Sequence, residues 1–554
     1  MSLHSKPFTA IPEETARVAR AAFPQGNLYI RMRDEIGVIY EDEAFASLFS
    51  HRGQPAEAPW RLALVTIMQY AEGLPDRQAA DAVRSRIDWK YALNLELTDP
   101  GFDHTVLSEF RTRLITGSAE HLLLDTFLQM CRERKFLKTR GRQRTDSTHV
   151  LAAIRVLNRL ECVGETLRHA LNSLAGVAPQ WVRRHCPAEW VERYGPRVEN
   201  YRLPPSKAER GAEAERIGRD GHALLTGLYA ADAPAWLREM PAVETLRQVW
   251  VQQYYLMEEM VQWRSMEEHG IPPAHLFINS PYDPEAHCAA KRSTQWVGYR
   301  VHLTETCAEE CPRLITNVET TAAPTADNVT LPDIHSSLKA KDLLPRTHLV
   351  DSGYIAADLL VATEKEYGLD LGGPPRANYH WQAQAATGFA AADFTIDWQR
   401  QQAICPAGHA SSTWRPTIDR RGNAVISIKF ATRDCRPCPH RPDCTRTTLG
   451  RRMLTIRPYE QFQALQHARA RQQTEEYKKE YAQRAGVEGT ISQAVGAFGL
   501  RRARYFGFLK TRFQHVLTAT ALNFVRISEW LAGTPLAKTR KSAFVRLMEQ
   551  PLAA

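Results

Sequence analysis

A stretch of alternating residue types near the middle of the chain constrains the fold most strongly. In WVGYRVHLTET, apolar side chains occupy every second position: Val297, Tyr299, Val301 and Leu303. Alternation with a period of two predicts a β-strand. A second strand pattern, RLITNVETT, follows, then a capped helix from about Asn328 to Ala340, and then the short apolar run THLV, which leads into Asp351. Two strands, a helix and a further strand in that order predict a mixed α/β sheet.

A basic run precedes another strand signal upstream. Between Arg132 and Arg144 there are seven basic residues and one acidic residue, and RTDSTHVLA comes next. Its β-branched residues favour a short strand that carries Asp146. The basic run itself fits either a DNA-contact surface or a solvated charged face.

A third carboxylate belongs to the stretch YKKEYAQRAGVEGTISQ. If one helix continues through Val487, the side chains of Tyr481, Arg484 and Glu488 lie on one face. A carboxylate can take a metal ion, a guanidinium can bind two phosphate oxygens and a tyrosine ring can stack beside them. These groups suit a phosphodiester substrate. The alternative, a surface aromatic and a salt-bridged arginine, stays open.

Four of the ten cysteines fall in one loop-rich segment: Cys405, Cys435, Cys438 and Cys444. Four thiolates can close a tetrahedral zinc site that stabilises a segment with little core of its own. Four free thiols and an iron–sulfur cluster are the alternatives. His409 and His440 are nearby substitutes should one cysteine not be a ligand.

Composition narrows the functional class. The 71 Lys and Arg residues outnumber the 62 Asp and Glu residues, which gives a net charge of +9 and favours a polyanionic partner. We see neither a signal-peptide pattern nor an apolar span long enough to cross a bilayer, so we expect a cytoplasmic protein that does not contact membranes.

The three carboxylate motifs resemble a known family. RTDST, HLVDSGY and Y-x2-R-x3-E, in this order, resemble the DDE transposases of bacterial insertion sequences, whose catalytic core has the ribonuclease H-like fold. GLPDRQAADAVRSRIDWKYAL, FDHTVLSEFRTRL, GLRRARYFGFLKT and TALNFVR extend the resemblance over most of the chain. The resemblance implies that Asp146, Asp351 and Glu488 are catalytic and hold two Mg²⁺ or Mn²⁺ ions.

The chain departs from the related signature at one position. A Lys is expected seven residues after the glutamate, but Val495 stands there. The replacement cation, together with Tyr481 and Arg484, would contact DNA. The candidates for it are Arg501, Arg502, Arg504 and Lys510.

The predicted fold class is α/β, with a ribonuclease H-like mixed-sheet core interrupted by insertions. The predicted domains are a helical N-terminal DNA-binding region (1–135), a split catalytic core (136–155, 275–394 and 456–535), a helical insertion (156–274), a Cys-rich insertion with one structural zinc ion (395–455) and a C-terminal tail (536–554). The sequence pattern of the N-terminal region fits an ordinary helical bundle as well as it fits a DNA-binding domain.

The resemblance implies a bacterial, nucleoid-associated transposase. It would bind double-stranded DNA at the element ends, cleave it by metal-dependent hydrolysis and join the 3′-hydroxyl to target DNA. Family members work on paired ends, so a homodimer or larger synaptic complex is expected. The alternatives are a non-catalytic DNA-binding protein derived from a transposase and a stand-alone metal-dependent nuclease.

Overall fold

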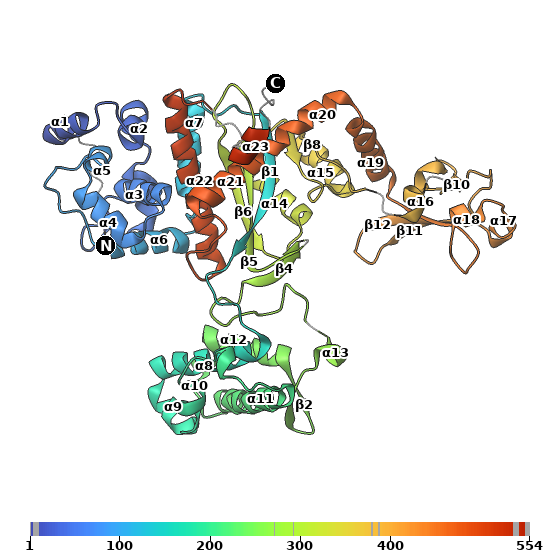
Figure 1. Ribbon diagram of the computed structural model, residues 1–554, viewed down its shortest axis with the longest axis horizontal. Helices are drawn as coiled ribbons and strands as arrows, with labels where there is room; N and C mark the ends of the chain where they lie inside the picture. The colour runs from blue at the N-terminus through green and yellow to red at the C-terminus, as the bar shows by residue number, and fades with distance from the viewer. Residues whose placement is uncertain are drawn as a thin grey trace.

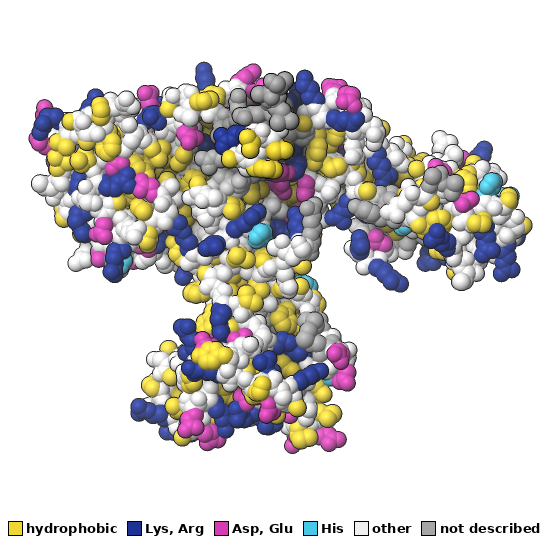
Figure 2. Space-filling model, viewed as in Figure 1, with side chains coloured by type: hydrophobic (Ala, Val, Ile, Leu, Met, Phe, Trp, Pro, Cys, Tyr) yellow, Lys and Arg dark blue, Asp and Glu magenta, His cyan; other side chains and the backbone are white. Residues whose placement is uncertain are grey.

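A central body with two projections makes up the molecule (Figure 1 and Figure 2). The structure, a computed structural model, describes residues 2–3, 10–270, 272–291, 293–377, 380–385, 388–535 and 542–548. The predicted tail 536–554 lies outside the described residues except for the segment that contains the short helix α23 (Ala543–Met548). No helix in the described part of the chain combines the length and apolar character that a membrane span requires.

A mixed six-stranded sheet forms the centre of the body. Its strands are β1 (Arg142–Leu151), β4 (His287–Lys291), β5 (Thr294–Thr306), β6 (Ile315–Ala322), β7 (Thr347–Val350) and β8 (Asp370–Gly372). β5 runs antiparallel to both β1 and β6, whereas β1, β7 and β8 are parallel neighbours. β4 and β6 pair with successive parts of β5. The mixed sheet predicted from the sequence is confirmed.

Both faces of this sheet are buried. His302 and Thr304, the polar members of the alternating run in β5, are 0% exposed, just like the apolar ones beside them. Helices account for this burial, since α21 (Gly486–Phe498) packs on β1 and β5, while α14 (Asp327–Ala340) and α22 (Phe508–Leu531) pack on β6. Polar side chains inside the sheet must therefore find partners within the protein.

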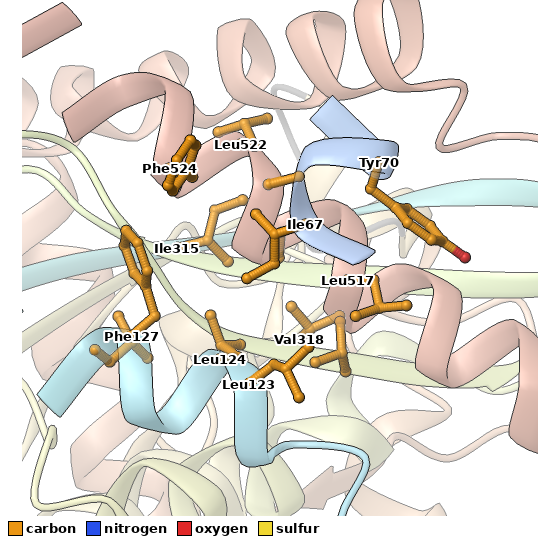
Figure 3. Packing of buried hydrophobic residues seen from close by; sticks show 14 of the residues in the cluster. Ile67, Tyr70, Leu123, Leu124, Phe127, Ile315, Val318, Leu517, Leu522 and Phe524 are labelled. Atoms are coloured by element: carbon orange, nitrogen blue, oxygen red, sulfur yellow. The ribbon is translucent and has the colours of Figure 1, made fainter. Parts of the chain in front are cut away.

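The N-terminal helices share one hydrophobic core with the sheet (Figure 3). They are α1 (Glu13–Ala22), α2 (Leu28–Ile36), η1 (Asp42–Leu48), α3 (Pro59–Glu72), α4 (Asp76–Ser85), α5 (Ile87–Ala92), α6 (Thr105–Thr116) and α7 (Leu122–Glu133). α22 lies between them and the sheet: Ile67 of α3 and Phe127 of α7 meet Leu517 and Phe524 of α22, with Val318 of β6 below. The N-terminal helices are thereby fixed to the core.

The segment between β1 and β4 forms the projection at the bottom of Figure 1. Its elements are α8 (Arg159–Val177), α9 (Pro179–His185), α10 (Trp190–Tyr194), η2 (Asn200–Arg202), α11 (Lys207–Tyr229), η3 (Ala235–Glu239), α12 (Pro241–Gln253), β2 (Tyr254–Met257), β3 (Met260–Trp263) and α13 (Met266–His269). It has a separate core. A Cβ at Gly221 would lie 2.0 Å from the ring of Trp250, so glycine permits close packing of α11 on α12.

The Cys-rich segment forms the projection on the right of Figure 1, which we call the arm and define as residues 395–455. It contains β9 (Thr395–Asp397), β10 (Gln402–Ile404), β11 (Thr413–Ile418), β12 (Ala424–Lys429), α17 (Thr432–Cys435), α18 (Arg441–Cys444) and β13 (Met453–Ile456). β11, β12 and β13 form an antiparallel sheet over a small core of its own.

Short connecting elements join the arm to the body. They are α15 (Ala357–Tyr367), α16 (Trp381–Gln384) and η4 (Ala391–Asp393) before it, and α19 (Tyr459–Gln472), α20 (Glu475–Ala482) and η5 (Gln483–Ala485) after it. α19 packs against α15. The chain returns through α20 and η5 to α21, which lies on the sheet.

Candidate active site

Two of the three predicted carboxylates lie on neighbouring parallel strands. Asp146 is in the middle of β1, and Asp351 directly follows β7. In the β1–β7 ladder Thr145 is opposite Val350, so the next residue on each strand is an aspartate. The two are close enough for the negative charge of Asp351 to raise the pKa of Asp146. The ladder thus brings the two predicted aspartates to the same level of the sheet, and their catalytic role stays a prediction.

Arg484 connects the third carboxylate to the first. Its Nη1 donates to Oδ2 of Asp146 at 3.0 Å, and its Nη2 donates to Oε1 of Glu488 at 2.7 Å. The side chains of Asp146 and Arg484 are each 15% exposed, whereas that of Glu488 is 62% exposed. Glu488 therefore stands at the open side of the group, held by an arginine that a phosphate could engage.

The electrostatics of Asp146 favour a bound cation. Burial raises the pKa of its carboxyl group most, and the charge of Asp351 adds to the effect, while the Ser147 amide and Arg484 act in the opposite direction. A divalent ion between two partly desolvated carboxylates would remove this penalty, and hard cations prefer such oxygens. Over the described ranges of the chain, however, no three Asp, Glu, His or Cys side chains are grouped closely enough to hold a metal ion as they stand.

The helix that carries Glu488 is interrupted, contrary to the single helix considered in the sequence analysis. α20 ends at Ala482, a 3₁₀ turn follows, and α21 begins at Gly486. A Cβ at Gly486 would lie 2.1 Å from Nη1 of Arg144, so this glycine lets the backbone pass directly over the guanidinium group. Arg144 in turn donates to the carbonyl oxygen of Gln483. The turn that presents Arg484 is thus fixed to β1.

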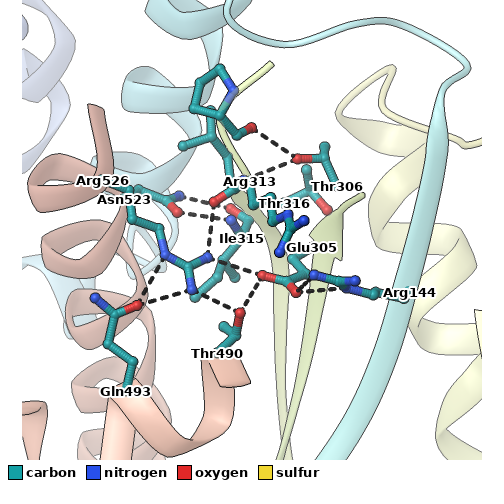
Figure 4. Close-up of polar contacts among 12 residues, drawn as sticks. Arg144, Glu305, Thr306, Arg313, Ile315, Thr316, Thr490, Gln493, Asn523 and Arg526 are labelled. Carbon is teal, nitrogen blue, oxygen red and sulfur yellow. Dashed lines mark hydrogen bonds and ion pairs between the residues drawn. The ribbon is translucent and has the colours of Figure 1, made fainter. Parts of the chain in front are cut away.

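A buried ion network supports this turn (Figure 4). Glu305 on β5 pairs with Arg144 through one carboxylate oxygen, at 2.7 Å, and with Arg526 of α22 through the other, at 3.0 Å. Thr490 of α21 donates to the same carboxylate. The sequence analysis considered the basic run, which includes Arg144, as a possible DNA-contact surface. That interpretation is wrong for Arg144, because its side chain is 3% exposed and forms an ion pair with Glu305.

Most of the remaining basic run also has partners within the chain, but at the protein surface. Arg132 pairs with Asp342, Lys138 with Glu310 and Arg142 with Glu480. Arg134 donates to the backbone carbonyl groups of Glu35 and Ile36. A DNA phosphate would compete with these exposed partners, so contact of the run with DNA stays a prediction.

A fourth carboxylate that sequence reasoning missed lies beside the predicted ones. Asp327, the first residue of α14, accepts hydrogen bonds from Ser147 at 3.0 Å and from Arg300 at 2.9 Å. A Cβ at Gly353 would lie 2.8 Å from Oδ2 of Asp327 and 2.9 Å from Oδ1 of Asp351, so both carboxylates border the same glycine. The only sign of Asp327 in the sequence is an aspartate at the start of a helix that follows a core strand. Many helices without a functional site begin with an aspartate, so this pattern did not single it out.

Two further buried residues complete this layer. Tyr354 and His302 share a hydrogen bond of 2.6 Å, and both side chains are 0% exposed. Burial lowers the pKa of His302 to about 4, so its imidazole is neutral at physiological pH. The layer below the aspartates therefore carries the Asp327–Arg300 ion pair and neutral hydrogen-bonding groups.

Tyr481 lies half-buried next to the carboxylates. Its ring stacks on Tyr477, with ring centroids 5.7 Å apart and planes 9° apart. Burial raises the pKa of its hydroxyl, which stays protonated. This position beside Arg484 is compatible with a DNA contact, and the assignment stays a prediction.

Arg501, one of the four predicted replacement cations, contacts β1, the strand that carries Asp146. Its Nε donates to Oγ1 of Thr148 at 2.9 Å, and Thr148 lies two residues after Asp146 on β1 and hence on the same face. Backbone hydrogen bonds between Leu151 and this segment hold it alongside β1. Val495, by contrast, packs against the core.

The other three cations, Arg502, Arg504 and Lys510, are exposed. Arg504 lies over the ring of Tyr70, with its guanidinium carbon 4.8 Å from the ring centroid. Their DNA contacts stay predictions.

The four cysteines of the arm surround one cavity, which His409 and His440 also line. Burial raises the pKa of the Cys444 thiol, and the other three thiols add to the effect. Cys435 and Cys444 end the short helices α17 and α18, and Cys405 follows β10. The structure thus brings the four predicted residues together, although in the described part of the molecule they are not arranged closely enough to count as a metal site.

Comparison with known protein families gives two matches. A model described as a transposase DDE domain matches residues 404–528, and a model described as a transposase domain matches residues 17–113. No curated protein and no solved structure matches the chain. The first match contains the arm cysteines, Arg484 and Glu488, whereas Asp146 and Asp351 lie outside both matches.

Proposed function

We propose that this chain, which belongs to the DDE transposases of insertion sequences, cleaves DNA at the ends of its element and joins the freed 3′-hydroxyl to target DNA. The observation that carries the proposal is the meeting of Asp146 and Asp351 on adjacent parallel strands, with Glu488 linked to Asp146 through Arg484. Three separate sequence motifs supply these groups.

The strand order supports a ribonuclease H-like core. β6, β5 and β1 are successive antiparallel neighbours, and β7 and β8 continue the sheet parallel to β1. This is the arrangement expected from the resemblance. The helical insertion follows β1 in the chain. The arm lies between β8 and α21, the helix that carries Glu488.

The carboxylates fit a divalent-metal site by their chemistry. Asp146, Asp351 and Glu488 would hold Mg²⁺ or Mn²⁺, two ions in the predicted arrangement, which activate the attacking oxygen and stabilise the leaving oxygen of the phosphodiester. Arg484 would exchange its carboxylate partners for the phosphate, which its planar fork binds through two oxygens. Neither cleavage nor joining requires a covalent intermediate with the protein.

The remaining assignments concern DNA and structural zinc. Tyr481, Arg484 and Arg501 would contact the DNA next to the reacting phosphate. Arg502, Arg504, Lys510 and the N-terminal helices would hold the duplex further away. The cysteines that line the arm cavity would bind one structural zinc ion. A homodimer or larger complex would pair the two DNA ends.

The test uses DNA that carries the ends of the element, with Mg²⁺. Asp146→Asn, Asp351→Asn and Glu488→Gln should each abolish cleavage while DNA affinity is kept, because loss of one ligand disables the metal site. The matched control is Asp342→Asn, which changes an exposed carboxylate. Normal cutting by any of the three variants would remove that residue from the site.

Two other functions use parts of the same structure. A non-catalytic DNA-binding protein would bind the ends without cutting them. A stand-alone nuclease would cut in a manner that depends on the three carboxylates but would yield no joined product. A strand-transfer assay with labelled end DNA and a circular target separates all three.

A further inference from the structure

The positive charge of the chain is concentrated unevenly, and the arm holds the largest excess. Residues 395–455 contain eleven Lys and Arg against four Asp and Glu, a formal net charge of +7 where the whole chain has +9. By the same count the N-terminal region 1–135 has −3 and the helical insertion 156–274 has −2. A polyanion would therefore be attracted to the arm more than to either of these helical regions.

The sheet of the arm gathers polar side chains on one face, which also carries Val425 and Met453. Ile426 and Ile428 of β12 and Leu454 of β13 are buried in the core of the arm. The register places Arg415 of β11 opposite Ser427, and Ser427 opposite Thr455. Directly opposed residues share a face, so these side chains lie on the side away from the core.

The outer face of this sheet combines two cations with four hydroxyl groups. Its polar residues are Thr413, Arg415, Thr417, Ser427, Lys429 and Thr455. Ser427 and Lys429 are half-buried, and the other four are exposed. Arg, Lys, Ser and Thr are the side chains that contact phosphate oxygens in protein–DNA complexes.

The turn between β11 and β12 adds two more cations. Arg420 and Arg421 are exposed there. The single carboxylate of the turn, Asp419, is occupied by the backbone amide groups of Arg421 and Asn423 and by the Asn423 side chain. The turn therefore offers two cations, while its own carboxylate is already hydrogen-bonded.

These arm cations differ from the basic run that leads into β1. Among the described residues, none of Arg415, Arg420, Arg421 and Lys429 forms an ion pair, whereas most of the run before β1 is paired or bonded. A cation without an internal partner can neutralise a phosphate without first breaking a bond inside the protein. In Figure 2, Lys and Arg side chains gather on the visible side of the arm and few acidic ones accompany them.

From these observations we infer that the arm binds DNA: the outer face of β11–β12–β13 and the turn between β11 and β12 contact the phosphodiester backbone of a duplex. The inference rests on the proposed function and names a binding surface beyond the residues assigned there. Because the contacts are to phosphates, they are independent of base sequence and weaken with salt. The chain continues from the arm through α19 and α20 to Arg484 and Glu488. Phosphate contacts of the arm would therefore add to the DNA affinity that the active-site residues provide.

The experiment is a salt titration of binding to a fluorescein-labelled, mixed-sequence duplex without added Mg²⁺ or Mn²⁺. The triple variant Arg415→Gln, Arg420→Gln and Arg421→Gln should lower the slope of log affinity against log salt by about 2–3, since each lost phosphate contact removes about 0.9. The matched control replaces Arg183, Arg184 and Arg219, which are exposed arginines of the helical insertion, and loses the same net charge. Its slope should equal that of the natural chain.

Replacement of the three arm arginines by Lys keeps the charge and should keep the slope. The inference would be overturned if the arm glutamine variant had the same salt slope as the natural chain. It would also be overturned if the control variant lowered the slope as much as the arm variant does. DNA cleavage that persists with such equal slopes would leave the proposed function standing. Absence of salt-dependent DNA binding by the natural chain would overturn both.

Discussion

Arg144 and Glu305 are directly opposed across strands β1 and β5 and form an ion pair of 2.7 Å inside the protein. Their side chains are 3% and 0% exposed. The second oxygen of Glu305 holds Arg526, so one carboxylate compensates two buried guanidinium groups. The pair lies two residues from Asp146 and directly under Gly486, where the glutamate helix begins. The turn that presents Arg484 therefore packs against a buried ion network.

Glu305→Gln keeps the shape of this side chain and removes its charge. Two buried cations then lack a counter-charge, so the free energy of unfolding should fall by about 3–5 kcal/mol. Urea denaturation followed by circular dichroism measures the change. Glu310→Gln is the control, because that carboxylate is 78% exposed and its pair with Lys138 lies at the surface, where solvent screens it. Equal stabilities of the two variants would contradict a structural role for the network.

Arg484→Lys tests the guanidinium group that bonds to both Asp146 and Glu488. A lysine keeps the positive charge but cannot bind two oxygens in one plane, so the cleavage rate should fall by about 10–100-fold, the equivalent of one hydrogen bond to a charged group. Single-turnover cleavage of end DNA gives the rate. Arg132→Lys changes a peripheral ion pair and should leave the rate unaltered. If both variants cut at the natural rate, Arg484 has only a structural role.

Gly353→Ala tests the close approach of Asp327 and Asp351. The added methyl group would lie 2.8 Å and 2.9 Å from their carboxylate oxygens and would push one of them away. Cleavage should fall at least about tenfold, because small displacements of catalytic groups are costly, while DNA affinity stays unchanged.

Gly489→Ala provides the matched control for this substitution. Gly489 follows Glu488 in α21, and a Cβ there meets nothing within 4 Å. Alanine should even stabilise the helix, by about 0.5–1 kcal/mol. Unaltered cleavage by Gly353→Ala would show that the carboxylate spacing at this glycine is unimportant.

The sequence predicted the mixed sheet because strands follow from local patterns. Alternation marks β5, and the short apolar run THLV that leads into Asp351 marks β7. The same patterns carry no information about the second face of a strand. His302 looks like a solvent-facing member of β5, yet its side chain is 0% exposed, since helices from distant segments cover that face.

The residues that the sequence analysis missed or misplaced depend on long-range contacts. Ser147 and Asp327 are 180 residues apart in the chain, and neither has a distinctive local context. Arg144 belongs by composition to a basic run, and only its pairing with Glu305 separates it from its neighbours. The break between Ala482 and Gly486 lies against Arg144, which donates to the carbonyl oxygen of Gln483, and no helix propensity reports such a contact.

The zinc content of the purified protein tests whether the four cysteines that line the arm cavity bind a metal ion. Protein purified under reducing conditions should contain about one zinc ion per chain, because four converging thiolates form a closed structural site. Cys438→Ser should lose the ion, whereas Cys288→Ser, at a half-buried cysteine outside the arm, should keep it. Metal analysis by mass spectrometry of the three proteins gives the answer directly.

A chelator should then loosen the arm before the body unfolds. Thiolate–zinc binding free energy contributes directly to folding where the apolar core is small, and the buried core of the arm consists of a few side chains around Phe430 and Ile428. Hydrogen exchange should accelerate in residues 395–455 and remain slow in β1 and α22, which lie in the large shared core. Zinc-free protein whose arm exchanges as slowly as before chelation would show that the four thiols are free and that the sheet of the arm is stable without a metal.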